Sequence, residues 1–158
     1  MAGSDYLLVI DKVRGESKDQ DFPDSIEVKG WSYGAISPTD PVNKLATGQP
    51  QFSDLTIVKG VDKTSPHLLE RLGRNMVADT AALICRKSGG DAHGYLRIEM
   101  KKVRVRSVSV KAAEAAGIMP VETLVLSYQK IKWIYKEQAA QGSMKGDVEY
   151  EYDAAANK

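Results

Sequence analysis

Hydrophobic and polar residues alternate along much of this chain, which is the pattern of β-strands with two different faces. Ile26 and Val28, for example, alternate with Glu27 and Lys29. Similar alternation, together with runs of β-branched and aromatic residues, predicts strands through most of the sequence. The predicted strands are Tyr6–Val13, Ile26–Tyr33, Phe52–Val58, Asp79–Lys87, Tyr95–Ser107, Thr123–Tyr135 and Val148–Tyr152.

One short helix is predicted within the segment Phe52–Arg74, where a strand and a turn precede it. Ser65 is a suitable N-cap, and Pro66 occupies the first helical position, where its missing N–H has no cost. An apolar stripe follows at helical spacing and consists of Leu68, Leu69 and Leu72. This amphipathic helix should therefore cover a β-sheet core.

The alternation changes register at Gly30, Lys101 and Gln129. After Gly30, for example, Trp31 and Tyr33 take the positions that polar residues held before it. Bulges or bends at such positions turn strands around the corners of a barrel. We therefore predict a mainly β fold, a β-barrel or sandwich of two packed sheets with one short α-helix and an extended loop.

The extended loop is the segment Ala35–Pro50, which has few large apolar residues and no regular alternation. It is rich in residues that interrupt regular structure, namely Pro38, Pro41, Gly48 and Pro50. We expect an excursion without regular secondary structure, and loops of this length in a compact domain are commonly functional or disordered. Two interpretations stay open, a floppy surface loop and an arm that grips a partner.

Other connections are predicted from turn chemistry. Ser88–Asp91 should join two strands as a hairpin turn, and Gly142–Gly146 is a glycine-spaced turn. Lys111–Ile118 fits either a brief helical turn or a loop, whereas the terminal Asp153–Lys158 is expected to fray.

The length and the net charge of the chain limit the classes of function that it can have. The 158 residues predict one domain, spanning residues 1–158. With 22 basic and 21 acidic residues the net charge is +1, which argues against binding to nucleic acid or to an anionic membrane. No apolar stretch is long enough to cross a bilayer, and the first residues lack the pattern of an ordinary signal peptide. Low net charge leaves little repulsion between copies, so strand edges can be shared in a closed ring that stacks into a tube.

A file of basic residues offers an alternative function. It consists of Arg97, Lys101, Lys102, Arg104 and Arg106. On one interpretation it is the face of a monomeric β-barrel binding module or small enzyme that takes an acidic ligand. The other interpretation, a solvated strand face, is favoured because no series of aromatic residues is interleaved with the basic ones.

Candidate metal ligands and nucleophiles are few. Cys85, the single cysteine, lies in a strand-like run and is expected to be a small buried hydrophobic residue. A lone cysteine also fits a chain that folds in a reducing cytoplasm. His67 and His93 have no partner at the spacing of a metal site.

The sequence offers equally little evidence for a catalytic site. Ser32 lies between aromatic residues in a strand rather than in a nucleophile elbow. The loop carboxylates Asp21 and Asp24 are interpreted as solvated side chains rather than an acid–base pair. We therefore predict no catalytic, cofactor-binding or metal-binding residue, and a protein that is not an enzyme.

Several short motifs occur in a defined order along the chain. The most distinctive are Phe52-x-Asp54-Leu55-Thr56-x-x-Lys59 and Asp62-Lys63-x-Ser65-Pro66-x-Leu68. Before them come Ile10-Asp11, Gly15-Glu16-Ser17, Ile26-Glu27-Val28 and Trp31-x-Tyr33-Gly34, and after them Arg86-Lys87-x-Gly89-Gly90, Tyr95-Leu96-x-Ile98 and Leu124–Tyr135. In order and spacing these motifs resemble the Hcp family, the tube subunits of the bacterial type VI secretion system. The resemblance covers nearly the whole chain, with departures at Ser107–Pro120 and Tyr150–Tyr152.

The resemblance implies a β-barrel with one helix that assembles as a homo-hexamer, a ring of six copies. Rings would stack into a tube inside a contractile sheath, with a spike protein at the tip and effector proteins in the lumen. Such a subunit is cytoplasmic before firing and is then secreted without a cleaved signal peptide. Ala35–Pro50 would be the extended loop that contacts the adjacent ring. A phage-like tail-tube protein on the same fold is a further alternative.

Overall fold

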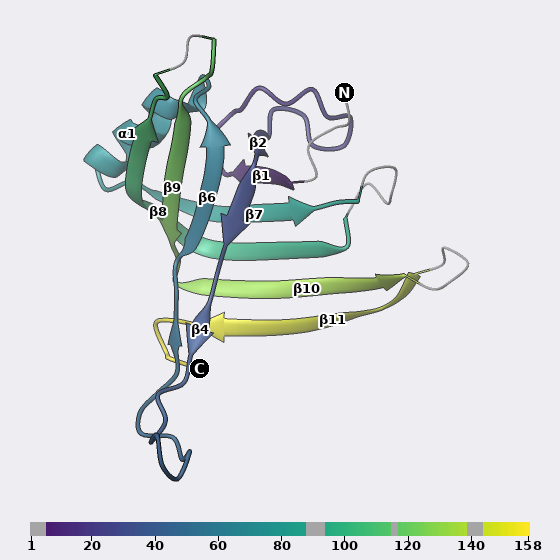
Figure 1. Ribbon diagram of the computed structural model, residues 1–158. Helices are drawn as coiled ribbons and strands as arrows, with labels where there is room; N and C mark the ends of the chain where they lie inside the picture. Colours follow the sequence, from purple (N-terminus) through teal and green to yellow (C-terminus); the bar gives the residue numbers. More distant parts are fainter. Residues whose placement is uncertain (1–5, 88–93, 115–116, 139–143) are drawn as a thin grey trace.

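The computed structural model describes residues 6–87, 94–114, 117–138 and 144–158. These residues form eleven strands and one helix, arranged as Figure 1 shows. The strands are β1 (Tyr6–Ile10), β2 (Ile26–Val28), β3 (Gly30–Ser32), β4 (Ala35–Ile36), β5 (Gln51–Phe52), β6 (Leu55–Gly60), β7 (Val77–Cys85), β8 (Leu96–Lys111), β9 (Val121–Ser127), β10 (Lys130–Gln138) and β11 (Met144–Asp153), and the helix is α1 (Thr64–Gly73). The predicted turn Ser88–Asp91, His93 and positions 142–143 lie outside the described residues.

Nine of the strands belong to one antiparallel sheet. Its hydrogen-bonded path runs β2-β1-β7-β8-β9-β6-β3, and β10 leaves this path by pairing with β8 on one side and β11 on the other. The path begins at β2 and ends at β3, which are separated in sequence only by Lys29. The sheet therefore folds back on itself without closing as a continuous ladder.

The long strand β8 is shared by both layers of the fold. Its first part, Leu96–Lys101, lies between β7 and β10, whereas Arg104–Lys111 pairs with β9. Figure 1 shows the consequence: β10, β11 and β7 run across the direction of β6 and β9. This is the orthogonal form of sheet packing, in which a strand passes from one layer to the other at a bend or bulge. The predicted mainly β fold with one helix is confirmed, as a sandwich rather than a closed barrel.

The register changes predicted at Gly30, Lys101 and Gln129 are all present. Met100 and Val103 both face the core, for example, with two exposed lysines between them. The register of β8 with β7 is unbroken there, and β7 likewise has two consecutive exposed residues, Asp79 and Thr80, so the two strands bend together. The β-bulge of β8 lies between Val105 and Ser107, in its pairing with β9. These positions therefore turn the strands between the two layers.

The core lies between the layers, and α1 covers one end of it. Fully buried core residues include Leu8, Leu55, Ile57, Leu83, Ile98, Leu124 and Leu126. From α1, Leu68 is fully buried and Leu72 packs against the core from the side. Burying a leucine side chain contributes roughly 1.5–3 kcal/mol. Leu68 and Leu72 of the predicted apolar stripe thus cover a β-sheet core as expected, whereas its third member, Leu69, is 57% exposed.

A separate two-stranded sheet, β4 with β5, carries the extended loop. Ala35 pairs with Phe52, and Ile36 pairs with Gln51. Beyond this sheet, residues 37–50 project away from the sandwich, at the foot of Figure 1. We call residues 37–50 the arm. The predicted excursion without regular secondary structure is confirmed for residues 37–50, whereas Ala35 and Ile36 were wrongly included, because they form β4.

Candidate functional site

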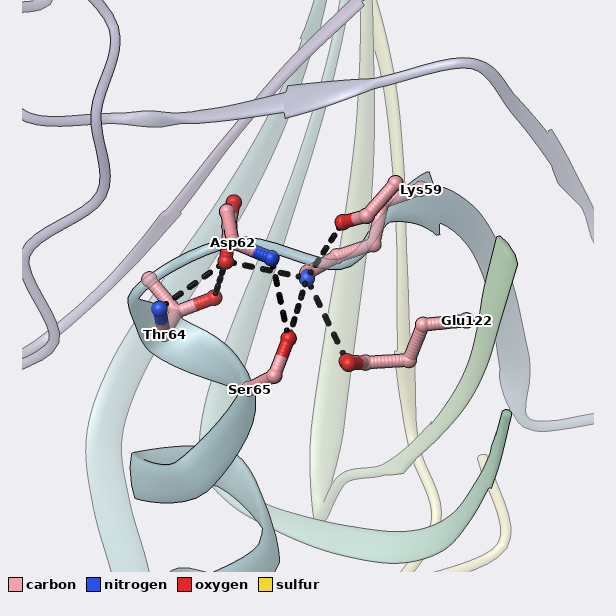
Figure 2. A network of polar contacts seen from close by, with 6 residues as sticks. Lys59, Asp62, Thr64, Ser65 and Glu122 are labelled. Atoms are coloured by element: carbon pink, nitrogen blue, oxygen red, sulfur yellow. Dashed lines mark hydrogen bonds and ion pairs between the residues drawn. The ribbon is translucent and has the colours of Figure 1, made fainter. Parts of the chain in front are cut away.

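A buried network of polar side chains joins the end of β6 to the start of α1 (Figure 2). The ammonium nitrogen of the fully buried Lys59 lies 3.0 Å from the carbonyl oxygen of Gly60, 3.1 Å from Asp62 Oδ1, 3.4 Å from Ser65 Oγ and 3.3 Å from Glu122 Oε2. An ammonium group has three N–H donors, which here donate to the oxygens of Gly60, Asp62 and Ser65, whereas Glu122 lies close enough for an ion pair only. Glu122 is also fully buried, and no described residue donates a hydrogen bond to its carboxylate. The ion pair with Lys59 is therefore its main electrostatic support.

The same network caps the helix, in a way that differs from the predicted cap. The helix begins at Thr64 rather than after Ser65. Asp62 Oδ1 accepts hydrogen bonds from the backbone N–H of Thr64, at 2.9 Å, and from the Thr64 hydroxyl. Ser65 Oγ instead accepts from the backbone N–H of Asp62, at 3.1 Å. A carboxylate is a stronger acceptor than a hydroxyl, so Asp62, held by Lys59, takes the capping role that was predicted for Ser65.

Two tyrosines connect the base of the arm to the sandwich. The hydroxyls of Tyr33 and Tyr128 lie 2.9 Å apart, and Tyr128 donates to the carbonyl oxygen of Ser53 at 2.7 Å. Ser53 in turn exchanges hydrogen bonds with Gly34, whose N–H donates to Ser53 Oγ and whose carbonyl accepts from Ser53 N–H. Burial raises the pKa of Tyr128 well above its usual value, and the hydrogen bond with Tyr33 raises it further. The hydroxyl therefore stays protonated and remains a donor to the base of the arm.

The arm is ordered by its own hydrogen bonds. Asp40 Oδ1 accepts from the backbone N–H groups of Val42 and Asn43, at 2.8 and 3.0 Å, which hold the pKa of Asp40 below its usual value. Asn43 Oδ1 accepts from the backbone N–H of Leu45 at 2.9 Å, and Asp40 N–H donates to the Leu45 carbonyl at 2.8 Å. The side chains of Val42 and Leu45 are nevertheless 88% and 66% exposed. The arm thus presents two aliphatic side chains to solvent in a preformed conformation.

The basic file is largely engaged within the chain. Its contacts are Arg97 with Glu99 at 2.7 Å, Lys102 with Asp79 at 2.9 Å, Arg104 with the Asn75 carbonyl at 2.9 Å, and Arg106 with Asp54 at 2.5 Å. The register change at Lys101 also divides the file between the two parts of β8. Side chains that are dispersed and already paired make a weak site for an acidic ligand.

The remaining candidate residues are dispersed. Cys85 is fully buried, and burial raises the pKa of its thiol to about 11, which confirms the predicted buried hydrophobic residue. His67 is exposed on α1, Ser32 is exposed on β3, and Asp21 and Asp24 are exposed in a loop. Within the ranges that the structure describes, no three His, Cys, Asp or Glu residues are grouped as metal ligands. A search of the same ranges finds no helix with the length and hydropathy needed to span a membrane.

Apart from Val9 on β1, the exposed large hydrophobic side chains of the described residues fall in four parts of the chain. They are Ile36, Val42 and Leu45 on β4 and the arm; Leu69, Met76 and Val77 along α1 and the start of β7; Val110, Ile118 and Met119 near the connection of β8 to β9; and Tyr135, Val148 and Tyr150 on β10 and β11. Grouped exposure of this kind marks protein–protein contact surfaces. The candidate functional site is therefore a set of surfaces rather than a cleft with reactive groups.

The known proteins that this chain resembles are type VI secretion system proteins. Residues 6–135 match the profile of a family described as "Type VI secretion system effector, Hcp". Over 157 residues the chain is 30% identical to Protein hcp1 of Pseudomonas aeruginosa, with 97% of this chain and 96% of that protein covered. A solved structure described as a type six secretion system protein has a TM-score of 0.90 and 26% identity, with 99% of both chains covered. Hcp1 from Salmonella typhimurium has a TM-score of 0.77 and 29% identity, with 100% of this chain and 99% of that chain covered.

Proposed function

This chain belongs to the Hcp family of type VI secretion system proteins, and from that membership we propose that it is a structural subunit of a secreted tube. Six copies form a ring, and rings stack head to tail into the tube. The lumen carries effector proteins, while the contractile sheath and the spike protein are the outer partners. The subunit moves from the cytoplasm to the exterior when the tube is fired and performs no catalytic step.

The observation that supports this proposal most directly is the arm. Ordering a loop costs conformational entropy, roughly 1–2 kcal/mol for each residue fixed. The arm is ordered by internal hydrogen bonds, yet Val42 and Leu45 are left exposed at its surface. A preformed segment with exposed aliphatic side chains is suited to docking on another molecule, because little ordering remains to be done on binding. In the proposed tube, that molecule is a subunit of the adjacent ring.

Light scattering after size-exclusion chromatography tests the ring. We expect a particle of about 104 kDa, six times the 17.3 kDa mass of the chain, that appears as an open ring in negative-stain images. A stable monomer across a wide range of protein concentration would contradict the proposal.

Salt concentration gives a second test. The net charge of +1 and the exposed apolar groups suggest that burial of apolar surface, rather than attraction between charges, holds the ring. The ring mass should therefore persist as salt is raised from low to about 0.5 M, where contacts between exposed charges are strongly screened. Dissociation at moderate salt would argue for a ring held by charge.

A further inference from the structure

The base of the arm lies against the hairpin of β10 and β11, and aromatic side chains gather there (Figure 1). The chain has two phenylalanines, two tryptophans and seven tyrosines. Seven of these eleven residues form ring pairs in this region, namely Trp31, Tyr33, Phe52, Tyr128, Trp133, Tyr150 and Tyr152. Apart from Tyr152, the buried hydrophobic residues of the described chain are all non-aromatic. The rings are therefore concentrated at one place rather than spread through the core.

The rings form two groups that together line a recess. In one group, the ring centroid of Phe52 is 3.8 Å from that of Tyr152 and 6.5 Å from that of Tyr150, and both pairs are stacked. In the other group, Tyr33 and Trp133 are 5.4 Å apart and tilted by 47°. The recess has a volume of about 300 Å³ and is lined by Tyr33, Phe52, Ile131, Trp133, Tyr150 and Tyr152. This volume is at the lower end of the range for small-molecule sites.

Contacts within one chain hold the walls of the recess. Trp133 and Tyr150 are directly opposed in the ladder of β10 with β11. On the other wall, the hydroxyl of Tyr33 is 2.9 Å from that of Tyr128. A ligand that enters a preformed recess has little ordering left to do. Because every lining residue belongs to the same chain, the site does not depend on the proposed ring.

The electrostatic character of the lining favours a cation. The face of an aromatic ring carries negative partial charge and attracts a cation within about 6 Å of its centroid. No described residue in the lining is basic, so no side chain of this chain supplies that cation there. Burial is the main cause that raises the pKa of Tyr33, and the nearby carboxylate of Asp54 also raises it. Since Arg106 pairs with Asp54, the rings rather than this carboxylate supply most of the attraction.

We propose that this recess binds a quaternary ammonium group, such as the trimethylammonium group of choline. The charge of this group is surrounded by methyl groups, and it has no N–H that needs a hydrogen-bond acceptor. A primary ammonium has three N–H donors, which aromatic rings satisfy poorly. A neutral aliphatic group of the same shape gains nothing from the charge distribution of the rings, so a preference for the cation is the specific consequence. Free choline and the headgroup of phosphatidylcholine share this chemistry.

Two compounds of matched shape test the proposal. Choline and 3,3-dimethylbutan-1-ol differ in that a carbon atom of the neutral alcohol replaces the nitrogen. The methyl protons of each compound give one sharp NMR signal, and saturation transfer from the wild-type protein measures its binding. Sodium chloride keeps the ionic strength constant during the titrations, so that screening does not change. We expect a dissociation constant for choline about tenfold lower than that for the alcohol.

Substitutions on the hairpin locate the site. Tyr150→Leu removes one ring but keeps an apolar side chain, so the preference for choline over the alcohol should fall while the alcohol still binds. Trp133→Leu should have the same effect on the other wall. The matched control is Tyr135→Leu, because Tyr135 is 49% exposed on the same hairpin but does not line the recess. This control should keep the wild-type preference, and each variant should keep the wild-type circular dichroism spectrum.

Vesicles distinguish the two sources of the group. Phosphatidylcholine and phosphatidylethanolamine differ in the methyl groups on the headgroup nitrogen. Cosedimentation of the protein with vesicles of the first lipid but not of the second would support the proposal and assign the group to a membrane surface. Binding of free choline without cosedimentation would support it and assign the group to a small solute.

Other results would overturn the proposal. Equal affinity for choline and the alcohol would show a merely apolar recess, and the absence of saturable choline binding would show no ligand site. Loss of the choline signal as the protein is concentrated into larger particles would assign the recess to another copy of the chain. Rings that do not bind choline would overturn this inference alone, whereas a monomer that binds choline would overturn the proposed function alone.

Discussion

Lys59 and Glu122 stand directly opposite each other in the antiparallel ladder of β6 and β9, with both side chains fully buried. Opposed residues on one face of a sheet are in contact distance, so the register of the two strands fixes this ion pair, whose charged atoms lie 3.3 Å apart. Asp62 then brings the start of α1 to the same ammonium group. One lysine therefore holds together two strands and the start of the helix.

Replacement of this lysine should destabilise the fold strongly. Lys59→Met leaves the carboxylates of Glu122 and Asp62 without their cation, and breaking a buried pair in this way costs about 3–5 kcal/mol. The free energy of unfolding in a denaturant titration, at one fixed protein concentration, measures the loss. Arg74→Met removes an ion pair in which both side chains are largely exposed, and it should change that free energy far less.

A double-mutant cycle tests whether the pair acts as a unit. Glu122→Leu in the Lys59→Met background removes the charge that the single variant leaves unpaired. The double variant should therefore lose less stability than the sum of the two single variants. Strict additivity of the two losses would show that the two side chains are not coupled.

Part of this network could be predicted from the alternation of residues. Lys59 follows Leu55 and Ile57 at steps of two, and Glu122 precedes Leu124 in the same way, so strand periodicity places both charges on the inner face. Charge itself indicates exposure, and only the pairing of β6 with β9 brings the two residues together. That pairing joins segments far apart in the sequence, so the burial of this pair could not be derived from local pattern.

Other features of the fold could be predicted where their cause lies within a few residues, and could not where it depends on residues far apart in the sequence. The register changes at Gly30, Lys101 and Gln129 were predictable, because each is visible within a few residues. The C-terminal segment was predicted wrongly to fray. Asp153 and Lys158 exchange backbone hydrogen bonds of 2.7 and 3.1 Å, and the neighbouring Tyr152 side chain is buried in the core. The terminal sequence alone could not show that Tyr152 packs against core residues that are distant in the sequence.

Removal of one hydroxyl should loosen the base of the arm. Tyr128→Phe deletes the donor to the Ser53 carbonyl and the partner of the Tyr33 hydroxyl, so we expect a loss of about 1 kcal/mol in the free energy of unfolding. Hydrogen exchange at the Ser53 amide should become faster, and NMR spectroscopy measures this exchange rate residue by residue. Tyr135→Phe removes the hydroxyl from a side chain that is 49% exposed, and it should leave this exchange rate unchanged.

The raised pKa of Tyr128 also predicts how the free energy of unfolding changes with pH in the alkaline range. Tyrosine in the unfolded chain ionises near pH 10, whereas burial raises the pKa of Tyr128 in the folded chain. Unfolding above this pH therefore releases a proton, and the free energy of unfolding should fall as the pH rises above about 10. Because other groups titrate in the same range, the difference between wild type and Tyr128→Phe isolates this contribution. An equal slope for both proteins above pH 10 would contradict it.

Cys85 should be unreactive in the native protein. Burial raises the pKa of its thiol from 9.0 to about 11, so the thiolate is scarce at pH 8 and the side chain is inaccessible. A thiol-specific reagent such as Ellman's reagent should modify it only as fast as the protein opens, with a rate that rises in denaturant. The added cysteine of Leu45→Cys, on the exposed arm, should react at once in the same protein. Rapid modification of Cys85 in the wild type would show that this part of the core is open to solvent.

The arm should control the stacking of rings. The double variant Val42→Asp with Leu45→Asp places charge on the two aliphatic side chains that the arm exposes, so rings should form but fail to stack. Scattering mass as a function of protein concentration measures stacking, because stacked rings give masses above that of a single ring. Gln49→Asp introduces charge at another exposed position of the arm and should stack as the wild type does. If the double variant instead dissociates to monomers, the arm holds neighbours within one ring, and the proposed docking of the arm on the adjacent ring would have to be withdrawn.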